Sequence, residues 1–236
     1  MQPDHRQVIA IDGPGAAGKS TVAQELANRT GAFLFDTGAL YRAVTLASVR
    51  AGIGGCDADR LANLARDLDI QIRPPSIPDG RQVDVLLGDE DITWAIRTPE
   101  IDAAVSEVSA HPSVRHELLA IQRRIADGAR VVMVGRDIGT VVVPQAGTKV
   151  YLVASTPERA RRRLQELRGR GIEATFDQVL ADLEARDTYD STRETAPLSA
   201  AADAIVIDTD GRSVEEIVSG IEEAVRAAWL AAGVSA

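Results

Sequence analysis

A glycine-rich segment near the start of the chain combines the residue types and the spacing of a phosphate-binding loop. It fits the pattern G-x-x-x-x-G-K-[ST] from Gly13 to Ser20. Glycines allow successive backbone N–H groups to point inward at the start of a helix, where an anion is favoured. In this pattern Lys19 would neutralise phosphate charge, and the Ser20 hydroxyl would contact Mg²⁺. The sequence therefore predicts a site for ATP and Mg²⁺, formed by Gly13, Pro14, Gly15, Ala16, Ala17, Gly18, Lys19, Ser20 and Thr21.

Three later segments carry polar side chains that could form a second anion site. They are the stretches 36–42 (DTGALYR), 135–140 (GRDIGT) and 186–193 (RDTYDSTR). Taken singly, each is more typical of a solvated ion pair or a turn. The first two follow apolar runs that we interpret as parallel strands, so their polar groups would meet at the carboxyl edge of a sheet, where ligands bind. Together with the phosphate-binding loop they favour a kinase of small molecules, because arginines can hold two polyanions close together.

Six arginines between residues 159 and 170 predict a mobile lid. Arg159 and Arg163 are four residues apart and share one helix face. We expect these two side chains to close over the donor phosphates and to exclude water. The spacing of the others spreads charge around the helix, so we expect them to be solvated; they are Arg161, Arg162, Arg168 and Arg170.

Short apolar runs alternate with helical patterns along the chain, and these elements would position the polar groups. The runs lack strict alternation, which is typical of strands buried on both faces of a parallel sheet; they occupy 7–12, 32–35, 131–134, 150–153 and 204–207. The helical patterns occupy 19–29, 39–51, 112–127, 157–168, 175–186 and 213–228. Two strand-like stretches, 70–73 and 81–87, flank proline and glycine turns and indicate a small inserted lobe with a hairpin. The predicted fold class is therefore α/β, with helices flanking a parallel sheet.

Composition and charge exclude several classes of protein. The chain has 236 residues, of which 45% are hydrophobic, so it can fold as one unit with a core. With 3% aromatic residues and a net charge of −9, we expect no nucleic-acid partner. No apolar run approaches the roughly 18 residues that span a bilayer, so we expect no membrane partner. Cys56 is the single cysteine, which excludes an intrachain disulfide and favours a cytoplasmic location.

Several stretches of the chain resemble, in order, the landmarks of the bacterial cytidylate kinases, the (d)CMP kinase branch of the P-loop nucleoside monophosphate kinases. They are IDGPGAAGKST, FDTGALYRA, IRTPEI with VSEVSAHPSVR, VGRDIGTVVVP, and RD…D…R followed by APL. The resemblance runs from about Val8 to Ile221. It implies a P-loop NTPase core and transfer of the γ-phosphoryl group of ATP to CMP or dCMP.

The resemblance also implies roles for single residues. Arg42 and Arg136 would hold the acceptor phosphate, and Arg186 and Asp190 would meet the sugar hydroxyls. The groups implied around the cytosine ring are Ser106, Arg115, Asp137 and Arg193. Thr37 is a further expected substrate contact, and the expected catalytic residues are Lys19, Arg136 and Arg186. The chain departs from many relatives at Tyr189, because an arginine often precedes the residue that matches Asp190. The charged contact that this arginine would make is therefore in doubt for this chain.

The expected organisation is a core interrupted by two mobile parts. The core comprises 1–36, 114–157 and 191–236, the monophosphate-binding lobe spans 37–113, and the lid region spans 158–190. We expect a monomer. Two alternatives stay open: a P-loop kinase of another small acceptor, such as UMP or shikimate, and a nucleotide-dependent switch or binding module. The choice between CMP and dCMP also stays open, as does the aspartate that could support Mg²⁺, because Asp36 and Asp137 both end strands.

Overall fold

The computed structural model of the chain describes residues 4–233, so the ends of the predicted core ranges, 1–3 and 234–236, lie outside the described residues. A parallel sheet in the order β2-β6-β1-β7-β8 forms its centre. Its strands are β1 (Val8–Asp12), β2 (Phe33–Asp36), β6 (Val131–Val134), β7 (Thr148–Val153) and β8 (Ile205–Asp208). Because β1 is central, the loop that follows it lies in the middle of the carboxyl edge.

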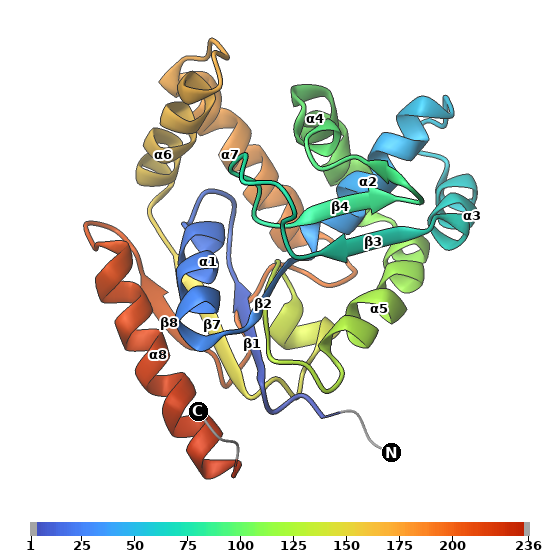
Figure 1. Cartoon of the computed structure of the whole chain (residues 1–236). Coiled ribbons are helices and arrows are strands. Elements are labelled where there is room, and N and C mark those ends of the chain that lie inside the picture. The colour runs from blue at the N-terminus through green and yellow to red at the C-terminus, as the bar shows by residue number, and fades with distance from the viewer. Residues whose placement is uncertain (1–3, 234–236) are drawn as a thin grey trace.

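Helices cover both faces of the sheet, as Figure 1 shows. On one face α1 (Lys19–Thr30) and α8 (Val214–Ala231) pack against a cluster that includes Ile9 and Ile11 of β1. On the other face α2 (Gly38–Arg50) and α5 (Pro112–Ala126) pack against a second cluster that includes Val8 and Ala10. Alternate residues of β1 therefore enter two different cores, which explains its uninterrupted apolar sequence. The predicted α/β fold class is confirmed.

The inserted lobe contains a small antiparallel sheet in the order β3-β4-β5. Its elements are α3 (Ala58–Asp67), β3 (Ile70–Arg73), β4 (Asp84–Leu87), β5 (Glu90–Asp91), the 3₁₀ turn η1 (Ala95–Arg97) and α4 (Pro99–Ala110). Apolar side chains of the lobe, such as Leu61 and Ile92, belong to the same cluster as Val8 of β1. The lobe and the sheet therefore share one core.

The region predicted as a lid, which we call the lid below, is a pair of helices with a small core of its own. Helix α6 (Thr156–Gly169) packs along α7 (Phe176–Thr192), and Ala160 and Leu164 meet Val179 and Leu183 between them. In Figure 1 this pair stands above α1, and α4 stands to its right, above α2 and β4. A π-helical turn, η2 (Ile138–Val142), connects β6 to the segment before β7.

Three features differ from the sequence prediction. Helix α4 was not expected at all, and α7 continues to Thr192 instead of ending near residue 186. Strand β8 is not buried on both faces, because it forms the edge of the sheet: Ile205 and Val206 are 42% and 59% exposed.

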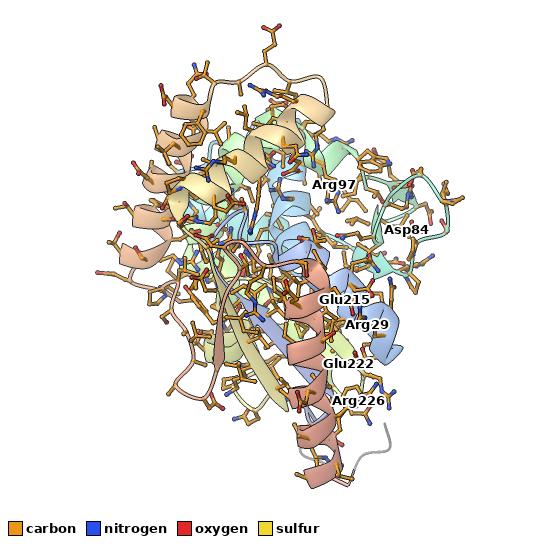
Figure 2. All side chains as sticks on the ribbon, turned by 90° about the vertical axis from the view of Figure 1, so that its left-hand side faces the viewer. Arg29, Asp84, Arg97, Glu215, Glu222 and Arg226 are labelled. Atoms are coloured by element: carbon orange, nitrogen blue, oxygen red, sulfur yellow. The ribbon has the colours of Figure 1, made fainter. Side chains whose placement is uncertain are left out.

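Ion pairs join the two helices that cover the first face. Arg29 of α1 pairs with Glu25 of its own helix at 2.8 Å and with Glu215 and Glu222 of α8, the latter at 3.5 Å (Figure 2). Arg29 therefore bridges α1 and α8 at their polar rim. None of the helices in the described range 4–233 has both the length and the apolar character needed to cross a membrane.

Candidate active site

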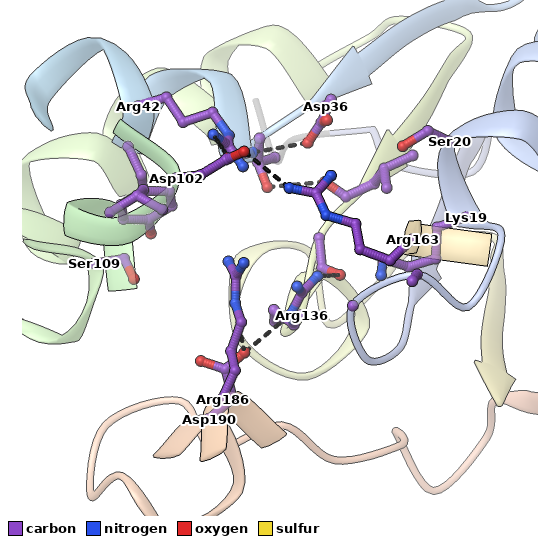
Figure 3. A pocket seen from close by; sticks show the side chains of 18 of the residues that line it. Lys19, Ser20, Asp36, Arg42, Asp102, Ser109, Arg136, Arg163, Arg186 and Asp190 are labelled. Carbon is purple, nitrogen blue, oxygen red and sulfur yellow. Dashed lines mark hydrogen bonds and ion pairs between the residues drawn. The ribbon is translucent and has the colours of Figure 1, made fainter. Parts of the chain in front are cut away.

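A cavity of about 610 Å³ opens at the carboxyl edge of the parallel sheet. The phosphate-binding loop lines one side, and the segments after β2 and β6, the lobe and the lid line the rest (Figure 3). Most of the predicted site residues line it together: Gly15, Ala16, Gly18, Lys19, Ser20, Thr21, Thr37, Arg42, Arg115, Arg136, Asp137, Arg163, Arg186, Asp190 and Arg193. The other predicted residues lie outside this lining, namely Gly13, Pro14, Ala17, Ser106 and Arg159.

The loop between β1 and α1 needs its glycines for geometric reasons. Gly13 has φ +144°, and a Cβ there would lie 2.2 Å from the Leu152 carbonyl oxygen of β7. Gly18 has φ +89° and precedes the first turn of α1. Both values favour glycine, because side chains with a Cβ rarely adopt positive φ. The backbone N–H groups at the start of α1 can therefore approach a ligand closely.

Lys19 is a buried cation on this loop. Its Nζ donates to the Pro14 carbonyl oxygen at 2.5 Å, and burial together with the neighbouring Arg136 guanidinium lowers its pKa well below the ordinary value. A nearby anion stabilises a cation in this condition, because it compensates for the hydration that burial has removed. The loop is thus electrostatically suited to phosphate.

Two arginines line the cavity together with the loop, and Arg136 lies next to Gly15. Arg136 follows β6, and Arg186 lies on α7 (Figure 3). Burial and the Arg136 charge lower the pKa of Arg186 to about 10. Their acidic neighbour is Asp190, whose Oδ2 accepts from Arg136 Nε at 3.1 Å and lies 4.0 Å from Arg186 Nε. One carboxylate between two arginines leaves positive charge for a ligand.

Asp190 therefore contacts arginines in this structure. Its Oδ1 also lies 3.6 Å from Arg193 Nη1, and its side chain is buried. Because α7 continues to residue 192, Arg186 and Asp190 lie one helical turn apart on the same face. The contact with the sugar that the family resemblance implied for Asp190 stays a prediction.

The groups implied for base recognition lie beside the lobe. Arg115 of α5 forms a buried ion pair with Asp137 and donates to the Ser109 carbonyl oxygen at 3.1 Å. Its guanidinium carbon lies 5.3 Å from the centre of the Tyr41 ring. Among the described lining residues, α4 contributes Ser109 and not Ser106, which lies one turn earlier. The role implied for Ser106 stays a prediction.

Thr37 is a buried part of the cavity lining. Its hydroxyl donates to the Val134 carbonyl oxygen at 2.9 Å, and its backbone N–H donates to the same oxygen at 3.0 Å. The side chain is buried, and a Cβ at the neighbouring Gly135 would lie 2.9 Å from its Oγ1. Thr37 thus joins the ends of β2 and β6, and its expected substrate contact stays a prediction.

The lid arginines occupy two different positions. Arg159 is buried, pairs with Asp187 of α7, and donates to the Gly15 carbonyl oxygen of the loop at 3.2 Å. Arg163 lies at the cavity and pairs with Asp102 of the lobe at 2.9 Å. Arg162, which we expected to be solvated, also lines the cavity and donates to the Thr209 carbonyl oxygen at 2.9 Å.

Sequence reasoning missed several side chains that line the cavity, among them Arg97, Asp102 and Gln82. The Nε of Arg97 is buried and has no hydrogen-bond partner within residues 4–233, and burial lowers the pKa of this guanidinium. Gln82, from the turn before β4, donates to the Ser20 carbonyl oxygen at 3.3 Å. Arg97 lies in the stretch IRTPEI and Asp102 directly follows it. The family resemblance therefore marked this region, but no helix was predicted there.

The aspartates near the loop differ in how far their carboxylates are free to contact a ligand or a metal ion. Asp12 accepts from the backbone N–H groups of Ile138 and Gly139, each at 2.8 Å, and burial raises its pKa to about 6. Asp137 is paired with Arg115. Asp36 lines the cavity and accepts from the Gly38 backbone N–H at 2.9 Å. Within the described part of the chain, no group of three or more His, Cys, Asp or Glu side chains could hold a metal ion.

Sequence comparisons with known proteins agree on one family. A sequence profile of the family described as cytidylate kinase matches residues 9–227. The cytidylate kinase of Chloroflexus aggregans is 50% identical over 213 residues, covering 90% of this chain and 91% of that protein. Those of Herpetosiphon aurantiacus and Geobacillus kaustophilus are each 48% identical, covering 90% and 92% of this chain and 91% and 95% of the two relatives.

Proposed function

The chain belongs to the cytidylate kinase family, and from this premise we propose that it transfers the γ-phosphoryl group of ATP to CMP or dCMP. The products are ADP and CDP or dCDP. One observation carries the proposal beyond the family relationship: Lys19 and Arg136 at the phosphate-binding loop and Arg186 on α7 line one cavity. A kinase whose acceptor is itself a phosphate needs two cationic surfaces.

The cations supply most of the chemistry. An oxygen of the acceptor phosphate forms the new bond to the γ-phosphorus, and the bond from that phosphorus to the bridging oxygen of ADP breaks. The acceptor phosphate is already ionised near neutral pH, so no general base is needed. Lys19, Arg136 and Arg186 would hold the two phosphates in line and stabilise the charge that spreads over the transferring group.

The remaining contacts divide between acceptor and donor. We assign Arg42 and Arg136 to the acceptor phosphate, and the Arg115–Asp137 pair and Arg193 to the cytosine ring. The Nη2 of Arg193 is buried without a hydrogen-bond partner among the described residues, which supports a ligand contact there. The loop residues and Arg163 of the lid would surround the phosphates of ATP, while Arg159 would hold α6 against the loop.

The residues present fit a Mg²⁺ ion that is bound largely by phosphates. Mg²⁺ retains several waters and commonly takes only one or two protein ligands together with substrate phosphates. The Ser20 hydroxyl is exposed at the loop, and Asp36 lines the cavity beside it. We propose these two residues as its protein contacts, Asp36 through water. When bound, the ion would supply positive charge at the donor phosphates.

The proposed organisation follows the predicted segments. Residues 37–113 would form the acceptor lobe and 158–190 the lid, with the sheet and its helices as the core. We propose that the protein acts as a monomer, since one chain supplies both cationic surfaces of the cavity.

The free thiol of Cys56 and the use of ATP support a cytoplasmic location.

ADP release over a panel of acceptors tests the proposal. CMP, dCMP, UMP and shikimate would each be supplied with ATP and Mg²⁺, beside a reaction without acceptor. We expect CMP and dCMP to give the highest kcat/KM. Faster turnover of UMP or shikimate would assign the protein another acceptor. An ADP release rate that no acceptor raises would favour a nucleotide-dependent switch.

A further inference from the structure

Asp102 joins two parts of the molecule that stand on opposite sides of the cavity. It lies on α4 of the lobe, and its Oδ1 pairs with Arg42 of α2. Its Oδ2 accepts from Arg163 Nη2 of α6 at 2.9 Å. Figure 3 shows Arg163 extended across the cavity toward Asp102. One carboxylate therefore bridges an arginine of the acceptor side and an arginine of the lid.

The surroundings of this bridge favour a charged carboxylate. Asp102 is 20% exposed, and burial acts to raise its pKa, but Arg42 and Arg163 outweigh burial and lower it. The Nη1 of Arg42 that pairs with Asp102 also donates to the Ile96 carbonyl oxygen at 3.3 Å. Asp102 therefore stays ionised at neutral pH and fixes the direction in which Arg42 points.

Arg163 has a competing partner on its own helix. Its Nη1 pairs with Glu166 at 2.8 Å, three residues later on α6. The packing core of α6 is shared with α7 and not with the lobe. Loss of Asp102 would therefore leave Arg163 with Glu166 alone, and the α6–α7 pair would lose an ion pair that reaches the lobe.

We propose that Asp102 is a positioning residue that couples the acceptor-phosphate site to the lid through Arg42 and Arg163. The proposal rests on the proposed function, because it takes Arg42 as a contact of the acceptor phosphate. Asp102 orients Arg42 toward that phosphate and draws Arg163 over the cavity. Binding of the acceptor phosphate at Arg42 is then coupled to the placement of Arg163 over the cavity.

The first test measures the distance between lobe and lid without substrate, so its outcome does not depend on the acceptor's identity. Cys56 in the lobe is exposed and is the natural labelling site. A second cysteine at Glu173, in the exposed loop between α6 and α7, completes a spin-label pair for pulsed electron paramagnetic resonance. We expect Asp102→Asn to broaden the distance distribution toward longer values. The control Glu166→Gln, which removes the competing partner, should give a distribution no broader than the unsubstituted pair.

The second test asks whether Asp102 acts through Arg163. Asp102→Asn should lower kcat/KM for CMP about tenfold, with both a higher KM for CMP and a lower kcat, and Asp102→Glu should restore part of the loss. In an Arg163→Gln background the same Asp102→Asn change should cost only about threefold, because the orientation of Arg42 is then the only function of Asp102 that is lost. Thermal unfolding of each variant confirms that the chain is folded.

Two results would overturn the coupling. One is a distance distribution that is identical with Asp and Asn at position 102. The other is a tenfold loss that persists in full when Arg163 is absent. Failure of the wild-type protein to phosphorylate CMP would instead count against the proposed function, and it would leave the distance measurement valid.

Discussion

Lys19 shows how a residue can serve ligand binding at the expense of stability. Its ammonium is buried and donates to a carbonyl oxygen and not to a carboxylate. Its pKa is lowered by burial and by Arg136, so the folded state disfavours the charged form. Because the pKa of Lys19 is lower in the folded state than in the unfolded chain, the free energy of unfolding decreases as the pH falls below the ordinary pKa of lysine. At pH 7 the burial of Lys19 therefore lowers the stability of the fold.

Replacing Lys19 with methionine should separate these two effects. We expect Lys19→Met to lower kcat with CMP at least a hundredfold, because the charge acts on the transferring group. The free energy of unfolding without nucleotide should stay equal or rise by about 1 kcal/mol, since a buried unpaired cation is removed. Steady-state kinetics and urea unfolding measure both. Turnover near the wild-type rate would refute the role of Lys19.

Asp12 gives the fold a pH dependence of its own. Burial raises its pKa to about 6 from an ordinary value of 3.8, so the folded state favours the protonated form. Its contribution to stability is present below pH 3.8 and is lost as the pH rises toward 6. Relative to Asp12→Asn, the wild-type free energy of unfolding should fall by about 2 kcal/mol between pH 4 and pH 7. A difference that is constant with pH would show that Asp12 is ionised throughout.

At the scale of single residues, sequence patterns predicted which groups meet but not how they pair. Most of the motif that ends at Ser20 lines one cavity with the arginines 42, 136 and 186, although Gly13, Pro14 and Ala17 lie outside the lining. The partners of those arginines depend on helices that are distant in the sequence, so spacing alone could not identify the bridge between Arg42 and Asp102. Pairing across the cavity is a property of the assembled fold.

Helix α4 shows why one element of the site escaped prediction. Its start carries ordinary signals: the Thr98 hydroxyl accepts from the Ile101 N–H, and Pro99 occupies the first turn. Its sequence lacks the separate polar and apolar faces that mark a surface helix, because both faces of α4 are covered by other parts of the protein or by the cavity. One side, including Ile101 and Val108, enters the shared core, and the other lines the cavity. An element that faces a core and a ligand site lacks a simple periodic pattern.

The lid helices should open more easily than the sheet, because their own core is small. Arg159, whose side chain is 4% exposed, fastens α6 through Asp187 of α7. Asp187→Asn would leave that guanidinium without its charged partner, which should lower the opening free energy of α6 by about 2 kcal/mol. Hydrogen exchange of the α6 amides measures this value.

The exposed pair Arg161–Glu158 on the same helix supplies the control for this prediction. Arg161→Gln should change exchange in α6 by less than about 0.5 kcal/mol, since exposed ion pairs contribute little. Amides of β1 should exchange as in the wild type in both variants. Equal effects of Asp187→Asn and Arg161→Gln would contradict the anchoring role of Arg159.

The whole molecule combines a rigid acceptor side with a lid that is less firmly attached. The lobe was expected from its turn residues, and the structure adds that its apolar side chains continue the core of the sheet. The lid has a separate core and reaches the rest of the chain largely through charged groups, including Arg159, Arg162 and Arg163. Closure around two nucleotides would then move α6 and α7 more than the lobe.

The central claim is that a phosphate on one side of the cavity receives the phosphoryl group held on the other. Phosphorus-31 NMR of a mixture of ATP, Mg²⁺, CMP and the protein tests it most directly, because it identifies where the phosphoryl group goes. We predict that the two phosphorus signals of CDP grow in step with those of ADP, one for one, while inorganic phosphate stays at its starting level. ADP that accumulates with inorganic phosphate in place of CDP would contradict the account.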